Sequence, residues 1–113
     1  MNPSDHVDVD SLAELKDIME DEFDILIDTF IADSEAKIAS MAEIIAASDA
    51  EELRKVAHSI KGSSSNVCAA QFSELARQLE HMGKEGTTDG AAEIFENLKQ
   101  EFTCVVATLK NHI

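Results

Sequence analysis

The stretch EFDILIDTFIADSEAKIASMAEIIAA, residues 22–47, decides the fold of this chain. Its apolar residues recur at intervals of three and four, with one longer gap, and no part of the chain alternates cleanly with the period of two that marks a strand. Such spacing places one apolar stripe along a helix. The stripe consists of Phe23, Leu26, Ile27, Phe30, Ile31, Ile38, Met41 and Ile45. The stretch therefore predicts a long amphipathic helix that packs against other helices.

The residues before this stretch predict a short first helix. SLAE, residues 11–14, matches a capping box, in which the side chains of Ser11 and Glu14 each satisfy a free amide at the helix start. An apolar stripe follows, made of Leu12, Leu15, Ile18 and Met19. Residues 1–10 contain three Asp and one Pro, and we expect them to form a flexible acidic lead-in. Residues 11–113 are expected to form a single domain.

Three more helices are predicted after residue 47. SDAE, residues 48–51, is a second capping box that begins the third helix, and the fourth helix is expected to stop at Gly83. GKEGTTDG, residues 83–90, reads as a loop, with a helix cap at Thr88 or Asp89 before the last helix. We therefore expect an all-α fold: an antiparallel four-helix bundle with a short extra N-terminal helix, in which sequential helices are neighbours.

Composition and charge exclude some classes of partner. The 113 residues contain 9 Lys and Arg against 23 Asp and Glu, so the formal net charge is −14. Such a surface repels nucleic-acid phosphates and anionic lipid, so neither nucleic acid nor membrane is an expected partner. The sequence shows no signal peptide or membrane span, and its two cysteines form no close pair, which favours a cytoplasmic protein with reduced thiols. No histidine has metal-ligand spacing, so no metal is assigned.

The candidate functional site lies in AHSIKGSSSNVCA, residues 57–69. A helix turns by about 100° per residue, so Ile60 lies about 160° from His58 and Leu53 about 140° from it. We therefore expect His58 to point to solvent while the opposite face of its helix packs into the bundle.

Small and basic residues surround His58 on this predicted helix. Arg54 and Gly62 each lie about 40° from it, while Lys61 lies about 60° away. Ser65 returns to within about 20°, one layer along. Gly62 costs a helix interior about 1 kcal/mol relative to Ala, and it either leaves space for a partner or serves close helix packing. Flanking cations suit an imidazole that accepts a phosphoryl group, although an ordinary surface histidine remains an alternative.

This stretch resembles the signature of histidine-containing phosphotransfer (HPt) domains. The family pattern is a His, an apolar residue at plus two, Lys-Gly at plus three and plus four, and a run of small residues that commonly ends in Gly-Ala. The matching residues are His58, Ile60, Lys61, Gly62, Ser63, Ser64, Ser65 and Ala69. The resemblance covers the whole chain, because these domains are helical, of about this size, and carry the His midway along the third of five helices.

The resemblance implies a role in a multistep phosphorelay. His58 would accept a phosphoryl group from an aspartyl-phosphate in a receiver domain and pass it to the Asp of another receiver. Lys61, with Arg54, would assist the phosphoryl oxygens, while Gly62 and Ser65 would leave clearance for docking. The expected partners are receiver domains of a hybrid sensor kinase and of a response regulator. The family has no ATP site, and Mg²⁺ is supplied by the receiver, so no cofactor and no ATP-dependent kinase activity are expected.

Cys68 departs from the family pattern, which often has Gly before the final Ala. A small buried hydrophobic side chain is one interpretation of Cys68, and redox control of transfer through its thiol is another. No kinase core or receiver sequence is present, so we expect a free-standing, monomeric shuttle between separate partners, with a domain of a larger hybrid kinase as the alternative.

Two other classes of function are compatible with an exposed histidine. A hydrolytic or transfer enzyme could use His58 as a base, but the sequence places no second carboxylate or nucleophile beside it. A non-catalytic adaptor could dock receiver or signalling domains through the same face without exchanging phosphate. Dimerisation domains of sensor kinases usually pair the His with an adjacent acid, whereas Ser59 follows His58 here.

Overall fold

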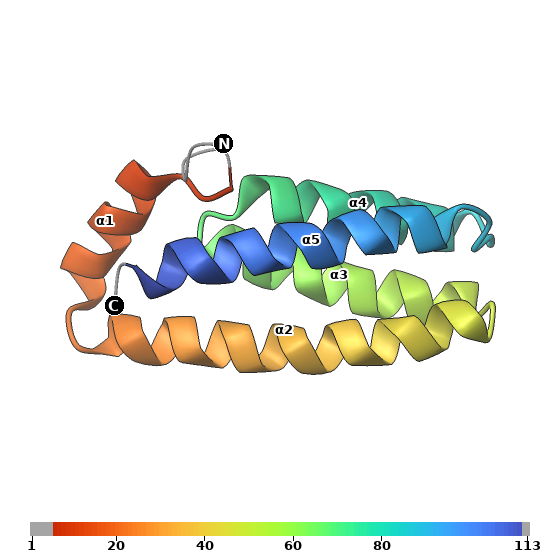
Figure 1. Ribbon diagram of the computed structural model, residues 1–113, viewed down its shortest axis with the longest axis horizontal. Helices are drawn as coiled ribbons and strands as arrows, with labels where there is room; N and C mark the ends of the chain where they lie inside the picture. The colour runs from red at the N-terminus through yellow and green to blue at the C-terminus, as the bar shows by residue number, and fades with distance from the viewer. Residues whose placement is uncertain (1–5, 112–113) are drawn as a thin grey trace.

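The computed structural model describes residues 6–111, which form five helices (Figure 1). These are α1 (Val9–Met19), α2 (Glu22–Ala46), α3 (Ala50–Asn66), α4 (Ala70–Lys84) and α5 (Ala91–Lys110). Helices α2 to α5 form the bundle, and α1 lies across one end of it, near the start of α2. The predicted four-helix bundle with a short extra N-terminal helix is confirmed, and residues 6–111 contain no strand.

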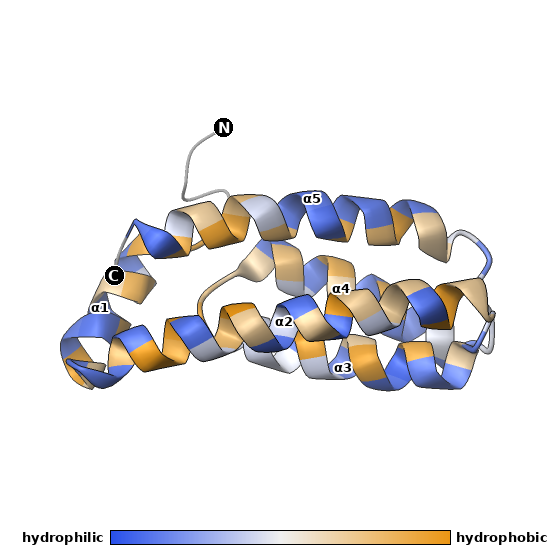
Figure 2. Cartoon of the chain, turned by 60° about the horizontal axis from the view of Figure 1, so that its bottom comes forward, coloured by the Kyte–Doolittle hydropathy of each residue, from blue (hydrophilic) through white to orange (hydrophobic). Residues whose placement is uncertain are grey.

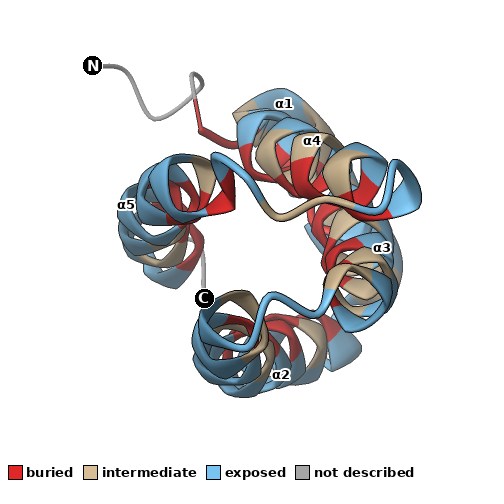
Figure 3. Cartoon of the chain, turned by 90° about the vertical axis from the view of Figure 1, so that its right-hand side faces the viewer, coloured by how far each residue is buried: buried red, intermediate tan, exposed pale blue. Residues whose placement is uncertain are grey.

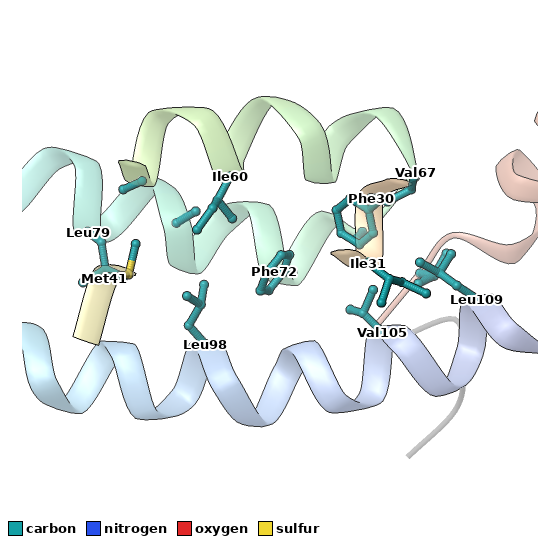
Figure 4. Packing of buried hydrophobic residues seen from close by; sticks show 14 of the residues in the cluster. Phe30, Ile31, Met41, Ile60, Val67, Phe72, Leu79, Leu98, Val105 and Leu109 are labelled. Carbon is teal, nitrogen blue, oxygen red and sulfur yellow. The ribbon is translucent and has the colours of Figure 1, made fainter. Parts of the chain in front are cut away.

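The apolar stripes of the four long helices meet in a common core. Viewed along the bundle, the buried residues of each helix face inward (Figure 3), and polar and apolar bands alternate along the helices (Figure 2). Three phenylalanine rings lie near one another in this core: the Phe30 and Phe72 centroids are 6.2 Å apart, and those of Phe72 and Phe102 are 5.5 Å apart. Figure 4 shows the packing of Ile60, Leu79 and Leu98 in the same core. Burial of these side chains is the main stabilising contribution to the fold.

Aspartates, not serines, cap the starts of α1 and α3. The Asp8 side chain accepts a hydrogen bond from the Ser11 amide, so α1 begins three residues earlier than the SLAE motif predicted. Asp49 caps α3 in the same way through the Glu52 amide. Both capping-box predictions were therefore wrong, because the caps lie three residues before Ser11 and one residue after Ser48, and aspartate caps a helix as well as serine does.

The predicted cap before α5 was also wrong. Gly90 stands at the N-cap position with a φ of 85°, and no side chain caps the helix. A left-handed φ is the conformation that glycine adopts at least cost. The chain therefore turns into α5 through the backbone of Gly90 and not through a Thr88 or Asp89 side chain.

The acidic lead-in predicted over residues 1–10 ends earlier than expected. Residues 1–5 lie outside the described part of the chain, but His6 and Val7 are buried. The His6 Nδ1 atom lies 2.8 Å from a carboxylate oxygen of Glu101 on α5. The Asp8 amide donates to the carbonyl of Cys68 between α3 and α4. This segment is therefore anchored to the bundle, because an apolar side chain and a paired imidazole gain from burial there.

Gly83 brings α4 close to α3 instead of ending α4. A Cβ atom at this position would lie 2.6 Å from the Ala50 carbonyl oxygen and 2.7 Å from the Arg54 backbone nitrogen. The helix continues to Lys84. Close contact at Gly83 places the preceding turn of α4, which carries Glu80, against the middle of α3.

Candidate functional site

His58 lies midway along α3 with its imidazole in solvent. Its side chain is 66% exposed, while Leu53, Ala57 and Ile60 of the same helix are fully buried. The predicted orientation of the ring is confirmed. A surface imidazole of this kind is accessible to a partner protein, and its reactivity depends on the groups that form hydrogen bonds with it.

A buried carboxylate from α4 holds the imidazole. The Glu80 side chain is only 4% exposed, and its Oε2 atom lies 2.6 Å from His58 Nδ1. Its Oε1 atom lies 2.6 Å from Lys61 Nζ, and Lys84 Nζ approaches Oε2 to 3.9 Å. One carboxylate therefore joins the histidine to two lysines from different helices.

The surroundings of Glu80 keep its carboxylate ionised. The hydrogen bond from Lys61 lowers the pKa of Glu80 below its ordinary value of 4.5; burial opposes this, and the hydrogen bond from His58 adds to it. A buried carboxylate without such donors would instead take up a proton. Glu80 is therefore a fixed negative charge beneath the imidazole at neutral pH.

This charge selects one tautomer of the neutral imidazole. An ionised carboxylate only accepts hydrogen bonds, so the bonded atom, Nδ1, carries the proton. In the neutral ring the lone pair then resides on Nε2. The arrangement thus presents Nε2 of His58 as the nucleophilic atom, held by a carboxylate on the opposite side of the ring.

The sequence interpretation missed Glu80, although its position in α4 carries a signal. Ala76, Leu79 and Gly83 form the buried stripe of that helix, and Glu80 lies between them on the same face. An acidic residue in an apolar stripe must find partners across the interface. The motif around His58 does not contain this residue, which is 22 positions away.

Gly62 and Ser65 differ in what surrounds them. A Cβ atom at Gly62 would meet no heavy atom within 4 Å, so this glycine does not serve helix packing and does leave open space beside His58. The Ser65 hydroxyl donates to the Lys61 carbonyl at 3.1 Å, and Ser73 of α4 donates to the same oxygen at 3.1 Å. Ser65 thus belongs to the contact between α3 and α4.

Arg54 lies outside the contacts that Glu80 makes. Its guanidinium pairs with Glu51 at 3.5 Å, one turn before His58 on α3. With Lys84 and Gly83 it lines an open surface hollow of about 610 Å³. The structure therefore joins Lys61 and Lys84 to His58 through Glu80, whereas Arg54 contributes a positive charge from one turn away.

The backbone conformation at Cys68 explains why the family pattern often has a glycine at this position. Its φ is 63°, in the left-handed region that glycine adopts without strain. The thiol is partly buried instead of fully buried as one interpretation held, and burial raises its pKa. Together with Lys61 it lines a hollow of about 410 Å³. A raised pKa makes the thiolate, which is the reactive form, scarcer.

Among residues 6–111, no group of three or more His, Cys, Asp or Glu side chains could hold a metal ion. In that same part of the chain, none of the helices is both long and apolar enough to cross a bilayer.

Comparisons with known proteins agree with this geometry. The family model of the Hpt domain matches residues 25–108. The chain is 37% identical to histidine-containing phosphotransfer protein B (HptB) from Pseudomonas aeruginosa PAO1, with a TM-score of 0.90, and the match covers 95% of this chain and 93% of the other. The histidine-containing phosphotransfer protein ZmHP2 from maize matches over 91% of this chain and 83% of the other, at 18% identity and a TM-score of 0.79. Comparison with curated protein sequences gives no match.

Proposed function

This chain belongs to the Hpt domain family and acts in histidine phosphotransfer within phosphorelays, and on this premise we propose that His58 accepts the phosphoryl group at Nε2. One observation carries the proposal: the ionised, buried Glu80 holds Nδ1 at 2.6 Å while the ring is 66% exposed. The exposed nitrogen is thus also the one with the lone pair.

The transfer step follows from this geometry. The Nε2 lone pair attacks the phosphorus of an aspartyl-phosphate on a receiver domain, so an N–P bond forms while the P–O bond to the aspartate breaks. The aspartate leaves as a carboxylate, and the ring keeps its Nδ1 proton. The ring gains positive charge as the bond forms, and Glu80 stabilises that charge from beneath. Attack by the aspartate of a second receiver reverses these changes.

Lys61 and Lys84 are the proposed partners of the phosphoryl oxygens. Both lie within reach of Glu80, and their side chains are 33% and 58% exposed, so each ammonium can turn toward a group on the solvent side. A phosphoryl group competes well for these cations because it carries more negative charge than one carboxylate. Arg54 would add its charge from one turn away, after releasing Glu51.

The open space at Gly62 is the proposed clearance for the receiver, with Ser65 at its edge. Hpt proteins interact with receiver domains, and we propose one receiver in a hybrid sensor kinase and one in a response regulator as the specific partners. We also propose that the receiver supplies Mg²⁺, that the chain needs no cofactor of its own, and that it works as a monomer in the cytoplasm. Neither nucleic acid nor membrane is a proposed partner, given the net charge of −14.

The proposed acceptor is tested by label transfer from a phosphorylated receiver domain. We expect wild type to take the label and His58→Gln to take none. His81→Gln is a matched control, because that imidazole is also 66% exposed and also contacts a carboxylate, Glu85. Label on His58→Gln, or its loss in His81→Gln, contradicts the assignment.

A further inference from the structure

A second charged cluster lies on the other flank of His58, at α2. Lys37 of α2 reaches across to α3, where its Nζ atom donates to the hydroxyl of Ser59 at 2.5 Å. The same ammonium lies 2.6 Å from a carboxylate oxygen of Asp33. Ser59 directly follows His58 in the sequence. Cations therefore lie on both sides of the phosphoacceptor, with Lys61 and Lys84 toward α4 and Lys37 toward α2.

The Lys37–Asp33 pair is poorly explained as a source of stability. The two residues are one helical turn apart, and the Lys37 and Asp33 side chains are 26% and 47% exposed. Ion pairs of this kind contribute little, because water and salt screen them. Exchange of Asp33 for another carboxylate would therefore cost little. An ammonium has three donors, and within residues 6–111 Lys37 uses two of them, toward Asp33 and Ser59.

The carboxylate that pairs with Lys37 also lines a hollow beside α3. Asp33 lines a small hollow of about 110 Å³ between α2 and α3, together with Ser63 and Asn66 of α3. Ser63 directly follows Gly62, where the space beside His58 opens. The Asp33–Lys37 pair therefore lies against the same helix that carries His58 and Gly62.

We propose that Lys37 is a docking residue whose ammonium exchanges Asp33 for an acidic side chain of the bound receiver. The partner group is acidic because it replaces the carboxylate of Asp33, and an ammonium pairs best with an anion. A chain with 23 acidic and 9 basic residues repels such a group over most of its surface. This inference rests on the proposed function. It separates two roles: Lys61 acts on the phosphoryl group, whereas Lys37 acts on the affinity for the receiver.

The experiment measures the initial rate of label transfer against receiver concentration, using a phosphorylated receiver domain that labels wild type. For Lys37→Met we expect the KM for the receiver to rise about fivefold and the saturated rate to stay within about twofold. For Asp33→Asn, which frees Lys37, we expect KM to fall about twofold. Lys55→Met is the control. It removes the same charge from an exposed α3 residue that pairs with Glu52 at 3.5 Å, and its KM should match wild type.

Salt and stability separate docking from a merely structural role. The KM difference between wild type and Lys37→Met should largely vanish at about 0.5 M salt, because exposed charges are then screened. An unchanged KM for Lys37→Met overturns the inference, as does a fall in the saturated rate together with the urea midpoint. Both results leave the proposed function standing if wild type is labelled. If no receiver labels wild type, the proposed function fails, and this inference fails with it.

Discussion

The Oε2 atom of Glu80 lies 2.6 Å from Nδ1 of His58, although the two residues are 22 positions apart and on different helices. In the proposed function, this contact directs the exposed histidine to react through its other ring nitrogen. The carboxylate is almost fully buried, and Lys61 and Lys84 compensate its charge. Glu80 therefore sets the tautomer of His58 and, in the unphosphorylated chain, also holds Lys61 and Lys84, the proposed partners of the phosphoryl oxygens.

The pH dependence of stability should report the charge of Glu80. The pKa of Glu80 is lowered in the folded chain, so its contribution to stability is present above pH 4.5 and is lost as the pH falls through the lowered pKa. Glu80→Gln has no such titration. We expect the urea midpoint of wild type to fall more between about pH 6 and about pH 3 than that of Glu80→Gln.

Glu85→Gln is the control for this comparison, because the Glu85 carboxylate is 59% exposed. It should follow the wild-type curve closely. An equal fall for wild type and Glu80→Gln means that Glu80 is not held ionised by its partners.

Lys61→Met should slow phosphoryl transfer more than it weakens the fold. We expect the saturated rate to fall about tenfold, because one cation that balances the phosphoryl oxygens is lost. The chain should still fold, with a free energy of unfolding lowered by about 1–3 kcal/mol, because Glu80 keeps its contacts with His58 and Lys84. Transfer kinetics and urea unfolding measure the two effects. Full transfer by a destabilised Lys61→Met variant would show that Lys61 only supports the fold.

Gly62 and Gly83 predict opposite effects of the same substitution. Gly62→Ala should fold at least as well as wild type, since its Cβ meets no atom within 4 Å and alanine favours a helix by about 1 kcal/mol. Gly83→Ala should lose about 1–3 kcal/mol, because its Cβ would lie 2.6 Å from backbone of α3. Thermal unfolding of both variants tests this contrast. Equal stability of the two variants would mean that α4 can move away from α3 at little cost.

Gly62→Glu extends the same contrast to docking. The added side chain fills the space beside His58 and brings negative charge, so transfer from a receiver should be blocked while the fold is retained. Circular dichroism checks the fold. Transfer at the wild-type rate by this variant would remove the clearance role of Gly62.

Cys68→Gly should stabilise the chain slightly. A φ of 63° costs a residue with a side chain about 1–2 kcal/mol, and glycine removes this cost. Glycine also makes the unfolded chain more flexible, which offsets part of the benefit, so we expect a net gain in stability of about 0.5–1 kcal/mol. Urea unfolding under reducing conditions measures it. A loss of stability would mean that packing of the Cys68 side chain outweighs the backbone strain.

The helices were predictable from the sequence, whereas their exact starts were not. The apolar stripe from Phe23 to Ile45 predicted α2 to within one residue at its end, because periodic burial of a long helix leaves a strong pattern. The caps were misassigned because Asp8 and Asp49 accept hydrogen bonds from helix-start amides as readily as Ser11 and Ser48 would. Only the backbone geometry decides between them.

The candidate site was predictable on α3 alone. Exposure of His58 follows from helical periodicity, since every residue in that argument lies on one helix. Glu80 reaches His58 only because Gly83 lets α4 approach α3, and that approach depends on a contact between backbones that no single-helix pattern contains. Lys37 was missed for the same reason, since its contact with Ser59 crosses from α2 to α3.

Phosphorus and nitrogen NMR of the phosphorylated chain, with labelled histidine, is the most direct test of the role of His58 and Glu80. It identifies both the residue and the ring atom that carry the phosphoryl group. We expect the phosphorus to be bonded to Nε2 of His58 and the proton to remain on Nδ1, beside Glu80. Phosphorus on Nδ1 of His58, or on another histidine, would contradict it, because the contact with Glu80 would then not direct the chemistry.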